Sequence, residues 1–333
     1  MIGRLLAAAL LASAGPAAAR TLEVGSGLAY AAPSDAAKVA TDGDSVTIAP
    51  GTYFDCAIWR ANGLTIAATG PDVRITDVAC QGKAAFVIGG NGVTVRGLSF
   101  MRIRVPDGNG AGIRAEGRDL TVEDSNFINN EVAILAGGQG GSLRISGSTF
   151  TGNGAGPENR PLNAVLAGPL ELVVVSHSVF GQARSGGHIT SSAQRTELIG
   201  NRLTDEGGRM TGPLVSIAGG TAVLDGNTVD LAPGAADRPG AVLVFGDAEA
   251  LTVRGNTLVE PAGGVPLVRN WGGVTAIDEN NTVPADAVAV SESGATYRRL
   301  RARIASLRDT ARGVAGAAKH DVAQVARGLR LIP

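Results

Sequence analysis

The feature that most constrains this chain is a repeat with a period of 23 to 30 residues. An alternating apolar string that ends in a turn and a last apolar residue recurs as GVTVRGLSF, DLTVEDSNF, SLRISGSTF, VVVSHSVF, TELIGNRL, AVLDGNTV, LTVRGNTL and, more loosely, IDENNTV. A period of this length is typical of stacked structural coils, each of which contacts only its neighbours. We therefore expect a solenoid.

One turn in each copy keeps the same register. The residue two positions before the last apolar residue is serine or asparagine in every copy but the first, and glycine commonly precedes it. Stacked asparagines can pair amide to amide between coils, and glycine suits the positive φ of a sharp bend. We predict a ladder along the stack through Leu98, Ser125, Ser148, Ser178, Asn201, Asn227, Asn256 and Asn281.

A further short apolar segment precedes each copy, as in AAFVIGG, AGIRAEG, VAILAGG and GHITSSA, so that each coil has three strands. The composition agrees, because 48 of the 333 residues are glycine and only 4% are aromatic. Such a composition favours short strands and tight turns over helices. The predicted fold is all-β, a single-stranded parallel β-helix with inward aliphatic side chains stacked along one axis.

The opening of the coiled region carries a resemblance to a known family. PSDAAKV predicts a short capping helix with Ser34 as its N-cap, which covers the edge of the first coil. The DGDSVTIAPGTY that follows resembles the same segment of the pectate-lyase-like proteins, which share the pectin lyase fold. That resemblance implies that the β-helix is right-handed.

The N-terminus predicts export. Residues 1–19 combine Arg4, an apolar run from Leu5 to Ala14 and a small-residue site, which indicates a signal peptide cleaved after Ala19. The apolar run is shorter than the about 20 residues of a membrane span. We expect a periplasmic or extracellular protein without a transmembrane segment after cleavage, whose β-helix domain occupies residues 20–295.

The two cysteines of the chain, Cys56 and Cys80, are 24 residues apart. This is one coil of the repeat, and neighbouring coils lie about 4.8 Å apart, within the reach of a disulfide. Exported proteins commonly hold their cysteines as disulfides. We predict that Cys56 and Cys80 are joined.

Residues 296–333 predict a basic amphipathic helix. Apolar residues recur every three or four positions from Tyr297 to Leu329, and eight arginines and one lysine outnumber two aspartates, for a net charge of +7. The domain before it has a net charge of −9. Three roles stay open for this segment: it folds back on the β-helix, joins copies of the chain through residues 297–329, or binds anionic lipid.

Resemblance to β-helix polysaccharide lyases implies a groove along the outward side chains of one sheet, where a basic side chain takes a proton beside a uronate carboxylate. With strict alternation of side chains, Ile113, Ile134, Val165, Ile189, Val242 and Leu267 point inward. The outward row that follows them is then Arg114, Leu135, Leu166, Thr190, Leu243 and Val268, with Arg114 as its one ionisable residue. On the other side of the inward row, His188 is also predicted to point outward.

The region 162–220 resembles a group of bacterial secreted β-helix proteins. Their matching strands read roughly His-Asn-Ile-Tyr-Val-Gly, Gly-His-His-Ile-Lys-Ser-Arg and Ile-Asp-Leu-Pro-Asn-Gly-Gly, where this chain has LNAVLAG, GGHITSS and VSIAGG. Thr190 and Ser192 replace the lysine and the arginine. The polar residues that remain are Asn163, His188, Ser191 and Arg195.

These patterns define two sets of candidates. The candidate catalytic residues are His188, as a base, with Arg184 and Arg195 beside it to hold a carboxylate. The candidate substrate-binding residues are Arg114, Asn163 and Ser191. A plainer interpretation is that His188 is only a rung of the scaffold. The early basic residues are either a basic loop or a solvated face: Lys83, Arg102 and Arg104.

Other chemistries lack the residues that they need. Acidic residues are scattered over different coils, so a Ca²⁺ site with its about six to eight converging oxygens is not supported, and we expect no cofactor. An acidic, aromatic-poor body disfavours nucleic acid as a partner. Two functions remain. The protein binds an acidic polysaccharide and cleaves it by β-elimination, or it is a non-catalytic envelope scaffold or binding protein with a degenerate site.

Overall fold

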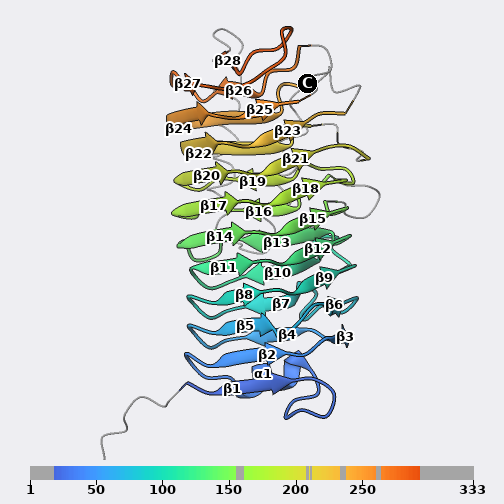
Figure 1. Ribbon diagram of the computed structural model, residues 1–333. Helices are drawn as coiled ribbons and strands as arrows, with labels where there is room; N and C mark the ends of the chain where they lie inside the picture. Colours follow the sequence, from blue (N-terminus) through green and yellow to red (C-terminus); the bar gives the residue numbers. More distant parts are fainter. Residues whose placement is uncertain are drawn as a thin grey trace, which may run out of the picture.

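The computed structural model describes residues 19–154, 161–207, 210, 212–232, 238–259 and 264–292. Over these residues the backbone winds into a tall stack of coils, and neighbouring strands of the stack run parallel (Figure 1). The prediction of an all-β parallel solenoid is confirmed. Residues 1–18 of the predicted signal peptide and the segment 296–333 lie outside the described residues.

Each coil contributes strands to three faces of the stack, which we call the first, second and third face. The first face consists of β4 (Ala57–Trp59), β7 (Ala84–Ile88), β10 (Ala111–Ala115), β13 (Val132–Ala136), β16 (Val165–Ala167), β19 (Ile189–Ser191), the start of β22 (Val215–Asp225) and of β24 (Val242–Arg254), β26 (Val268–Trp271) and β28 (Val290–Glu292). The second face consists of β1 (Thr21–Val24), β2 (Ser45–Ile48), β5 (Thr65–Ala68), β8 (Thr94–Arg96), β11 (Leu120–Glu123), β14 (Ser142–Ser146), β17 (Leu172–Ser176), β20 (Arg195–Ile199), the ends of β22 and β24, and β27 (Ile277–Glu279). The third face consists of β3 (Gly51–Tyr53), β6 (Val73–Thr76), β9 (Ser99–Met101), β12 (Asn126–Ile128), β15 (Thr149–Thr151), β18 (Val179–Gly181), β21 (Arg202–Thr204), β23 (Thr228–Asp230) and β25 (Thr257–Leu258).

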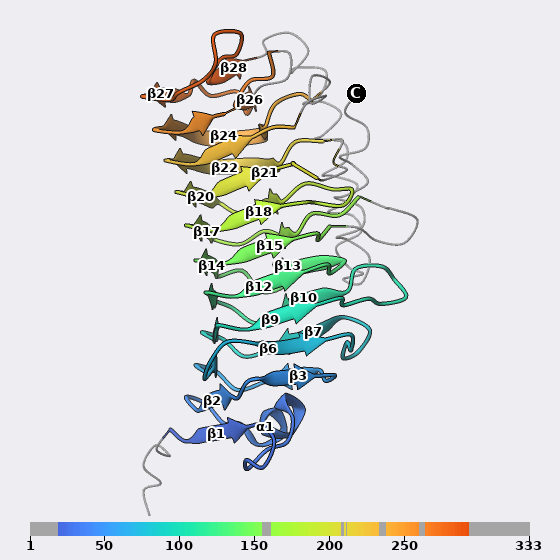
Figure 2. The same ribbon diagram turned by 45° about the vertical axis from the view of Figure 1, so that its right-hand side comes forward.

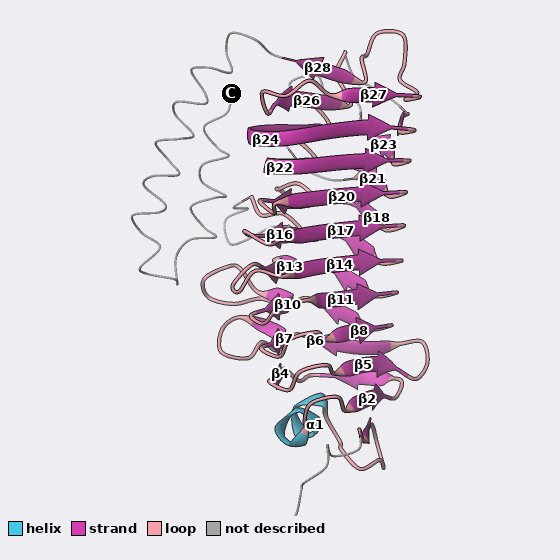
Figure 3. Cartoon of the chain, turned by 90° about the vertical axis from the view of Figure 1, so that its left-hand side faces the viewer, coloured by secondary structure: helices cyan, strands magenta, loops and turns pink. Residues whose placement is uncertain are grey.

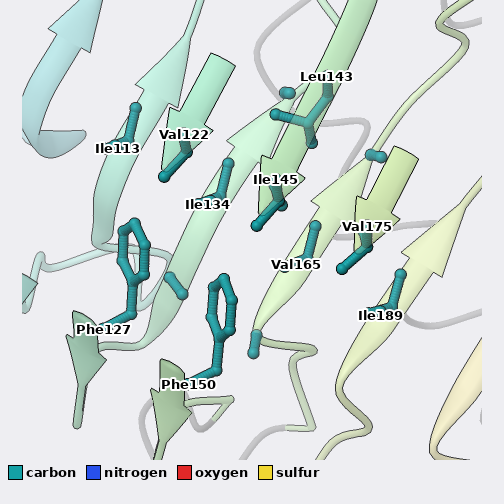
Figure 4. Packing of buried hydrophobic residues seen from close by; sticks show 14 of the residues in the cluster. Ile113, Val122, Phe127, Ile134, Leu143, Ile145, Phe150, Val165, Val175 and Ile189 are labelled. Atoms are coloured by element: carbon teal, nitrogen blue, oxygen red, sulfur yellow. The ribbon is translucent and has the colours of Figure 1, made fainter. Parts of the chain in front are cut away.

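The interior of the stack is filled by aliphatic and aromatic side chains from all three faces (Figure 4). Phenylalanines of the third face stack with nearly parallel rings: the Phe127 and Phe150 centroids lie 5.0 Å apart, and those of Phe150 and Phe180 lie 4.3 Å apart. These are the last apolar residues of the repeat copies. Each pair contributes about 0.5 to 1.5 kcal/mol beyond the burial of its area.

A continuous series of hydrogen bonds follows the turn between the second and third faces. The backbone N–H and the side-chain Nδ2 of Asn201 both donate to Asn227 Oδ1 at 3.0 Å. The same two groups of Asn227 donate to Asn256 Oδ1 at 2.9 Å. Earlier in the stack a serine hydroxyl replaces the amide: the backbone N–H of Ser125 donates to Ser148 Oγ at 3.1 Å. The turns therefore satisfy buried backbone groups that no strand pairs.

The helix α1 (Pro33–Val39) lies at the N-terminal end of the stack and buries Pro33 and Ala36 (Figure 2). The N-cap residue is Ala32, so the expectation that Ser34 caps this helix is wrong. Proline at the first position has a φ already suited to a helix, and the helix therefore begins one residue earlier. The Ser34 backbone N–H instead donates to Asp55 Oδ2 at 2.8 Å.

Cys56 and Cys80 form the predicted disulfide, with their Cα atoms 5.4 Å apart. The two cysteines precede strands β4 and β7, which pair directly on the first face. The bond therefore joins two neighbouring coils. Among the described residues, no helix is long and apolar enough to cross a membrane.

The hydrogen bonds of these turns give a first prediction. Asn227→Ala removes the acceptor for two N–H groups of Asn201 and the donor to Leu198 O, so buried groups lose their partners. We expect a loss of about 2 kcal/mol, measured as a lower urea midpoint. Asn126→Ala is the matched control, because Asn126 is a half-buried, outward asparagine whose side chain makes one long bond to Ser99 Oγ. A loss in Asn126→Ala as large as in Asn227→Ala would contradict a stabilising role of the Asn227 hydrogen bonds.

Candidate functional site

The corner where the third face meets the first face breaks the alternation of side chains. Two consecutive residues point inward there: Ala133 and Ile134 both expose 0% of their surface, and His188 and Ile189 expose 1% and 0%. The backbone N–H groups of His188 and Ile189 share the carbonyl of Leu214, as expected for a bend at this point. A Cβ added to Gly112, in the same position, would lie 2.9 Å from Phe100 and Phe127.

His188 is therefore an interior residue, and the prediction that it points outward is wrong. Its Nε2 lies 2.8 Å from the carbonyl oxygen of Thr204, and its ring lies 5.5 Å from that of Phe180. Burial, together with the charge of Arg238, lowers the pKa of His188 to about 4, although the hydrogen bond to Thr204 opposes both effects. A neutral, enclosed imidazole cannot reach a polymer outside the stack.

The outward row of the first face agrees with the prediction in all but its last member. Val268 pairs with Val242 and points inward, so its expected outward position is wrong, and Arg269 takes that position. The cause is the same corner, because Leu267 occupies the additional inward position there. The outward row consists of Val87, Arg114, Leu135, Leu166, Thr190, Ser216, Leu243 and Arg269.

Arg114, one of the predicted binding residues, belongs to a small charge cluster on β7 and β10. Glu116 Oε1 lies 2.6 Å from Lys83 Nζ and 3.4 Å from Arg114 Nε. One carboxylate thus partly neutralises two cations. The cluster keeps an excess positive charge at the surface.

The other predicted residues lie apart from this cluster and from one another. Arg195 belongs to β20 on the second face and pairs with Glu197 at 2.6 Å. Ser191 is fully buried, and its hydroxyl lies 2.7 Å from that of Thr196. Asn163 holds the backbone of its own corner, because its Oδ1 accepts from the Gly187 N–H at 3.0 Å and its Nδ2 donates to Thr190.

Among the predicted catalytic residues, Arg184 is the one whose side chain lies beside a second arginine, Arg104. Its Nη1 donates to Asn129 Oδ1 at 2.5 Å, and Arg104 Nη2 donates to the same oxygen at 2.8 Å. Arg104 also donates to the Asn129 carbonyl at 2.6 Å. Two guanidinium groups from coils far apart in the sequence therefore converge on one amide side chain. We call Arg104, Asn129 and Arg184 the arginine corner.

The repeat explains this convergence. Met101, Ile128, Thr151 and Gly181 stack in register on the third face, so the residues three positions later also stack: Arg104, Glu131, Gly154 and Arg184. Gly154 has no side chain, and Arg184 can extend back over it toward Asn129. Asn129 itself has a φ of 53°, a conformation that asparagine tolerates well and that directs its side chain out of the turn.

The electrostatics of the arginine corner favour an anion. Among the described residues, no carboxylate forms an ion pair with Arg104 or Arg184, whereas Arg96, Arg118, Arg202 and Arg254 each have one. Burial and the nearby charge of Arg184 lower the pKa of Arg104, and Glu131 raises it. Glu131 Oε2 is itself used by the N–H groups of Val105 and Gly110, and it anchors the loop after Arg104.

Within the described part of the chain, no group of three or more histidine, cysteine, aspartate or glutamate side chains converges as metal ligands would. Sequence reasoning missed Asn129 and the meeting of Arg104 with Arg184, because they are 80 residues apart in the chain. The signal that could have found them is the shared register position of Arg104 and Arg184, three residues after the stacked third-face strands.

Comparison with solved structures identifies the fold. An alginate lyase from Paenibacillus sp. str. FPU-7 superposes with a TM-score of 0.56 at 14% identity, covering 83% of this chain and 99% of the lyase. The chain has the right-handed β-helix of the pectin lyase fold. A pectin methylesterase from Aspergillus niger matches at a TM-score of 0.42 and 14% identity, covering 83% of this chain and 90% of its own. No family model and no curated protein matches the sequence.

The buried imidazole gives a prediction about pH. The pKa of His188 is lower in the folded protein than the about 6.5 of an unfolded chain. The contribution of its neutral form to the free energy of unfolding is therefore fully present above pH 6.5. It falls as the pH decreases from about 6.5 toward about 4, by up to about 3 kcal/mol, because the unfolded chain takes up a proton that the folded chain refuses. Urea midpoints between pH 7 and pH 4 measure this loss.

His188→Gln can keep a donor to Thr204 O without a titrating ring, and we expect it to flatten the loss of stability across this range. His177→Asn is the matched control. His177 is exposed at a turn with a φ of 48°, which asparagine also adopts. A pH dependence that is the same in His188→Gln and wild type would show that another group causes it.

Proposed function

We propose that the protein binds a carboxylate-bearing polysaccharide at the arginine corner and does not cleave it. The observation that carries this proposal is the convergence of Arg104 and Arg184 on Asn129 Oδ1, without a carboxylate partner among the described residues. A uronate carboxylate placed between the two guanidinium groups would accept hydrogen bonds from both, and planar guanidinium groups suit such pairing. The pectin lyase fold and the polysaccharide-acting neighbour support the substrate class in general terms.

The absence of turnover rests on the separation of the candidate groups. Elimination needs a base within hydrogen-bond reach of the proton and a cation at the carboxylate of the same sugar. His188 is enclosed, Arg195 lies on the second face, and Arg184 lies at the arginine corner. The three predicted catalytic residues thus share no surface, which favours the binding function over the lyase.

We also propose that the protein acts outside the cytoplasm, for which the disulfide and the N-terminal sequence are the support. In such a setting α1 would act as a cap that keeps the first coil from pairing with another chain. The asparagine ladder would hold the later turns in register. These two features make a stable scaffold on which a binding site needs few residues.

The test is the binding of the protein to soluble alginate and polygalacturonate, with uncharged dextran as the negative polymer. Charge-assisted hydrogen bonds contribute about 1.5 to 3 kcal/mol each, so we expect Arg104→Gln and Arg184→Gln each to weaken binding at least about tenfold. Binding should also weaken as salt is added. Calorimetry or affinity electrophoresis gives the affinities.

Arg96→Gln is the matched control, because Arg96 is also exposed but pairs with Glu123 on the second face. It should leave the affinity nearly unchanged. Equal affinities for wild type and the Arg104→Gln, Arg184→Gln double variant would overturn the proposed site. A rise in the ultraviolet absorbance of unsaturated sugar during incubation with either polyuronate would overturn the absence of cleavage.

A further inference from the structure

The outward row of the first face is covered, which is unusual for the outer surface of a solenoid. Leu135, Leu166 and Leu243 point away from the interior, yet they expose only 5%, 8% and 0% of their surface. The polar members between them, Thr190 and Ser216, expose 5% and 2%. A single sheet cannot hide its own outward side chains, so another segment lies over this row.

The second face shows what an uncovered row looks like. Its outward residues stack in the same way, and all of them are half-buried or exposed, including the apolar ones: Thr94, Thr121, Arg144, Val174, Glu197, Val223 and Thr252. The two rows differ in composition as well, because leucines are concentrated on the first face. The difference in exposure is therefore specific to that face.

Described residues cover the row from β7 to β16, and beyond it they make single polar contacts: Asn163 Nδ2 donates to Thr190, and Arg269 Nε donates to Pro239 O at 2.7 Å. Val87, Leu135 and Leu166 belong to a cluster outside the main core, and Ile58 of β4 and the disulfide-bonded Cys80 pack against it. Leu243 is fully inaccessible but belongs neither to this cluster nor to the main core. The described helix α1 packs at the opposite end of the stack, against β4 and β1. No described apolar cluster therefore covers Leu243.

We propose that the C-terminal segment 296–333 folds back as an amphipathic helix or helix pair and docks its apolar stripe on this row. The described chain ends at Glu292 in β28, which is itself a strand of the first face (Figure 3). From β28 to β13 is six coils, or about 29 Å. The segment has 38 residues and as a helix would extend about 57 Å, which is ample even with a break at Gly313 and Gly316.

The charges of the two partners favour this docking over pairing with the same segment of a second copy. The segment carries a net charge of +7 and the domain before it −9, so they attract, whereas two copies of the segment repel each other. Its apolar stripe, Tyr297, Leu300, Ile304 and Leu307, has the spacing that fits a row of leucines. The segment thereby closes the outer surface of the sheet that would otherwise lie open.

The experiment measures the accessibility of the row in the full chain without polysaccharide, so its outcome is independent of the proposed binding function. Thr190→Cys places a thiol in the covered row, and its rate of maleimide labelling is measured. We expect Leu300→Asp with Ile304→Asp to raise this rate at least about tenfold, because the two charges disrupt the apolar stripe. Ala302→Asp with Ser306→Asp adds the same charges off the stripe and should change the rate less than about twofold.

Two further measurements keep the result unambiguous. Val174→Cys on the second face should label at the same rate in all these backgrounds, and an unchanged far-UV spectrum shows that the β-helix persists. Equal labelling of the Thr190→Cys thiol in the stripe variant and the off-stripe variant would overturn the proposal. Protection that disappears on dilution would also overturn it, because the cover would then be a second copy of the chain.

Discussion

The structure depends on the parallel backbone hydrogen bonds that join each coil to the next. They hold successive coils about 4.8 Å apart and in register, so a residue lies directly against its counterpart one repeat away. This constraint makes like residues stack with like, as in the Phe127, Phe150 and Phe180 series and in the chain of bonds from Asn201 through Asn227 to Asn256. A polar residue in an inward position can find its partner at a corner, as His188 does in the carbonyl oxygen of Thr204.

The same constraint shapes the surface. A cation on one coil normally stands beside an anion on the next, as Arg254 does with Asp225 and Arg202 with Asp230. The arginine corner is an exception, because glycine fills one position of the stack and Glu131 Oε2 accepts from two backbone N–H groups and forms no ion pair with a described residue, although its charge still acts on Arg104. An excess of positive charge on an otherwise acidic domain is then available for a carboxylate from outside.

Much of the fold followed from the repeat, because a solenoid uses the same local pattern in every coil. The register of the turns, the disulfide between neighbouring coils and most of the outward row were all predictable from spacing. The site was less predictable. Strict alternation placed His188 outside, but the bend at the corner turns two consecutive residues inward, and no residue type in the sequence marks that bend.

The sequence by itself determined that this chain stacks in coils of 23 to 30 residues and which apolar residues share an axis, since that information is local and repeated. Only the tertiary structure decided whether each polar residue at the corners points into the interior of the stack or toward solvent. It also decided that Arg104 and Arg184 meet at Asn129 while His188, Arg195 and Arg114 do not meet at all. The physical reason is that a corner depends on backbone angles of a few residues, and a one-residue change there moves a side chain from solvent to the interior.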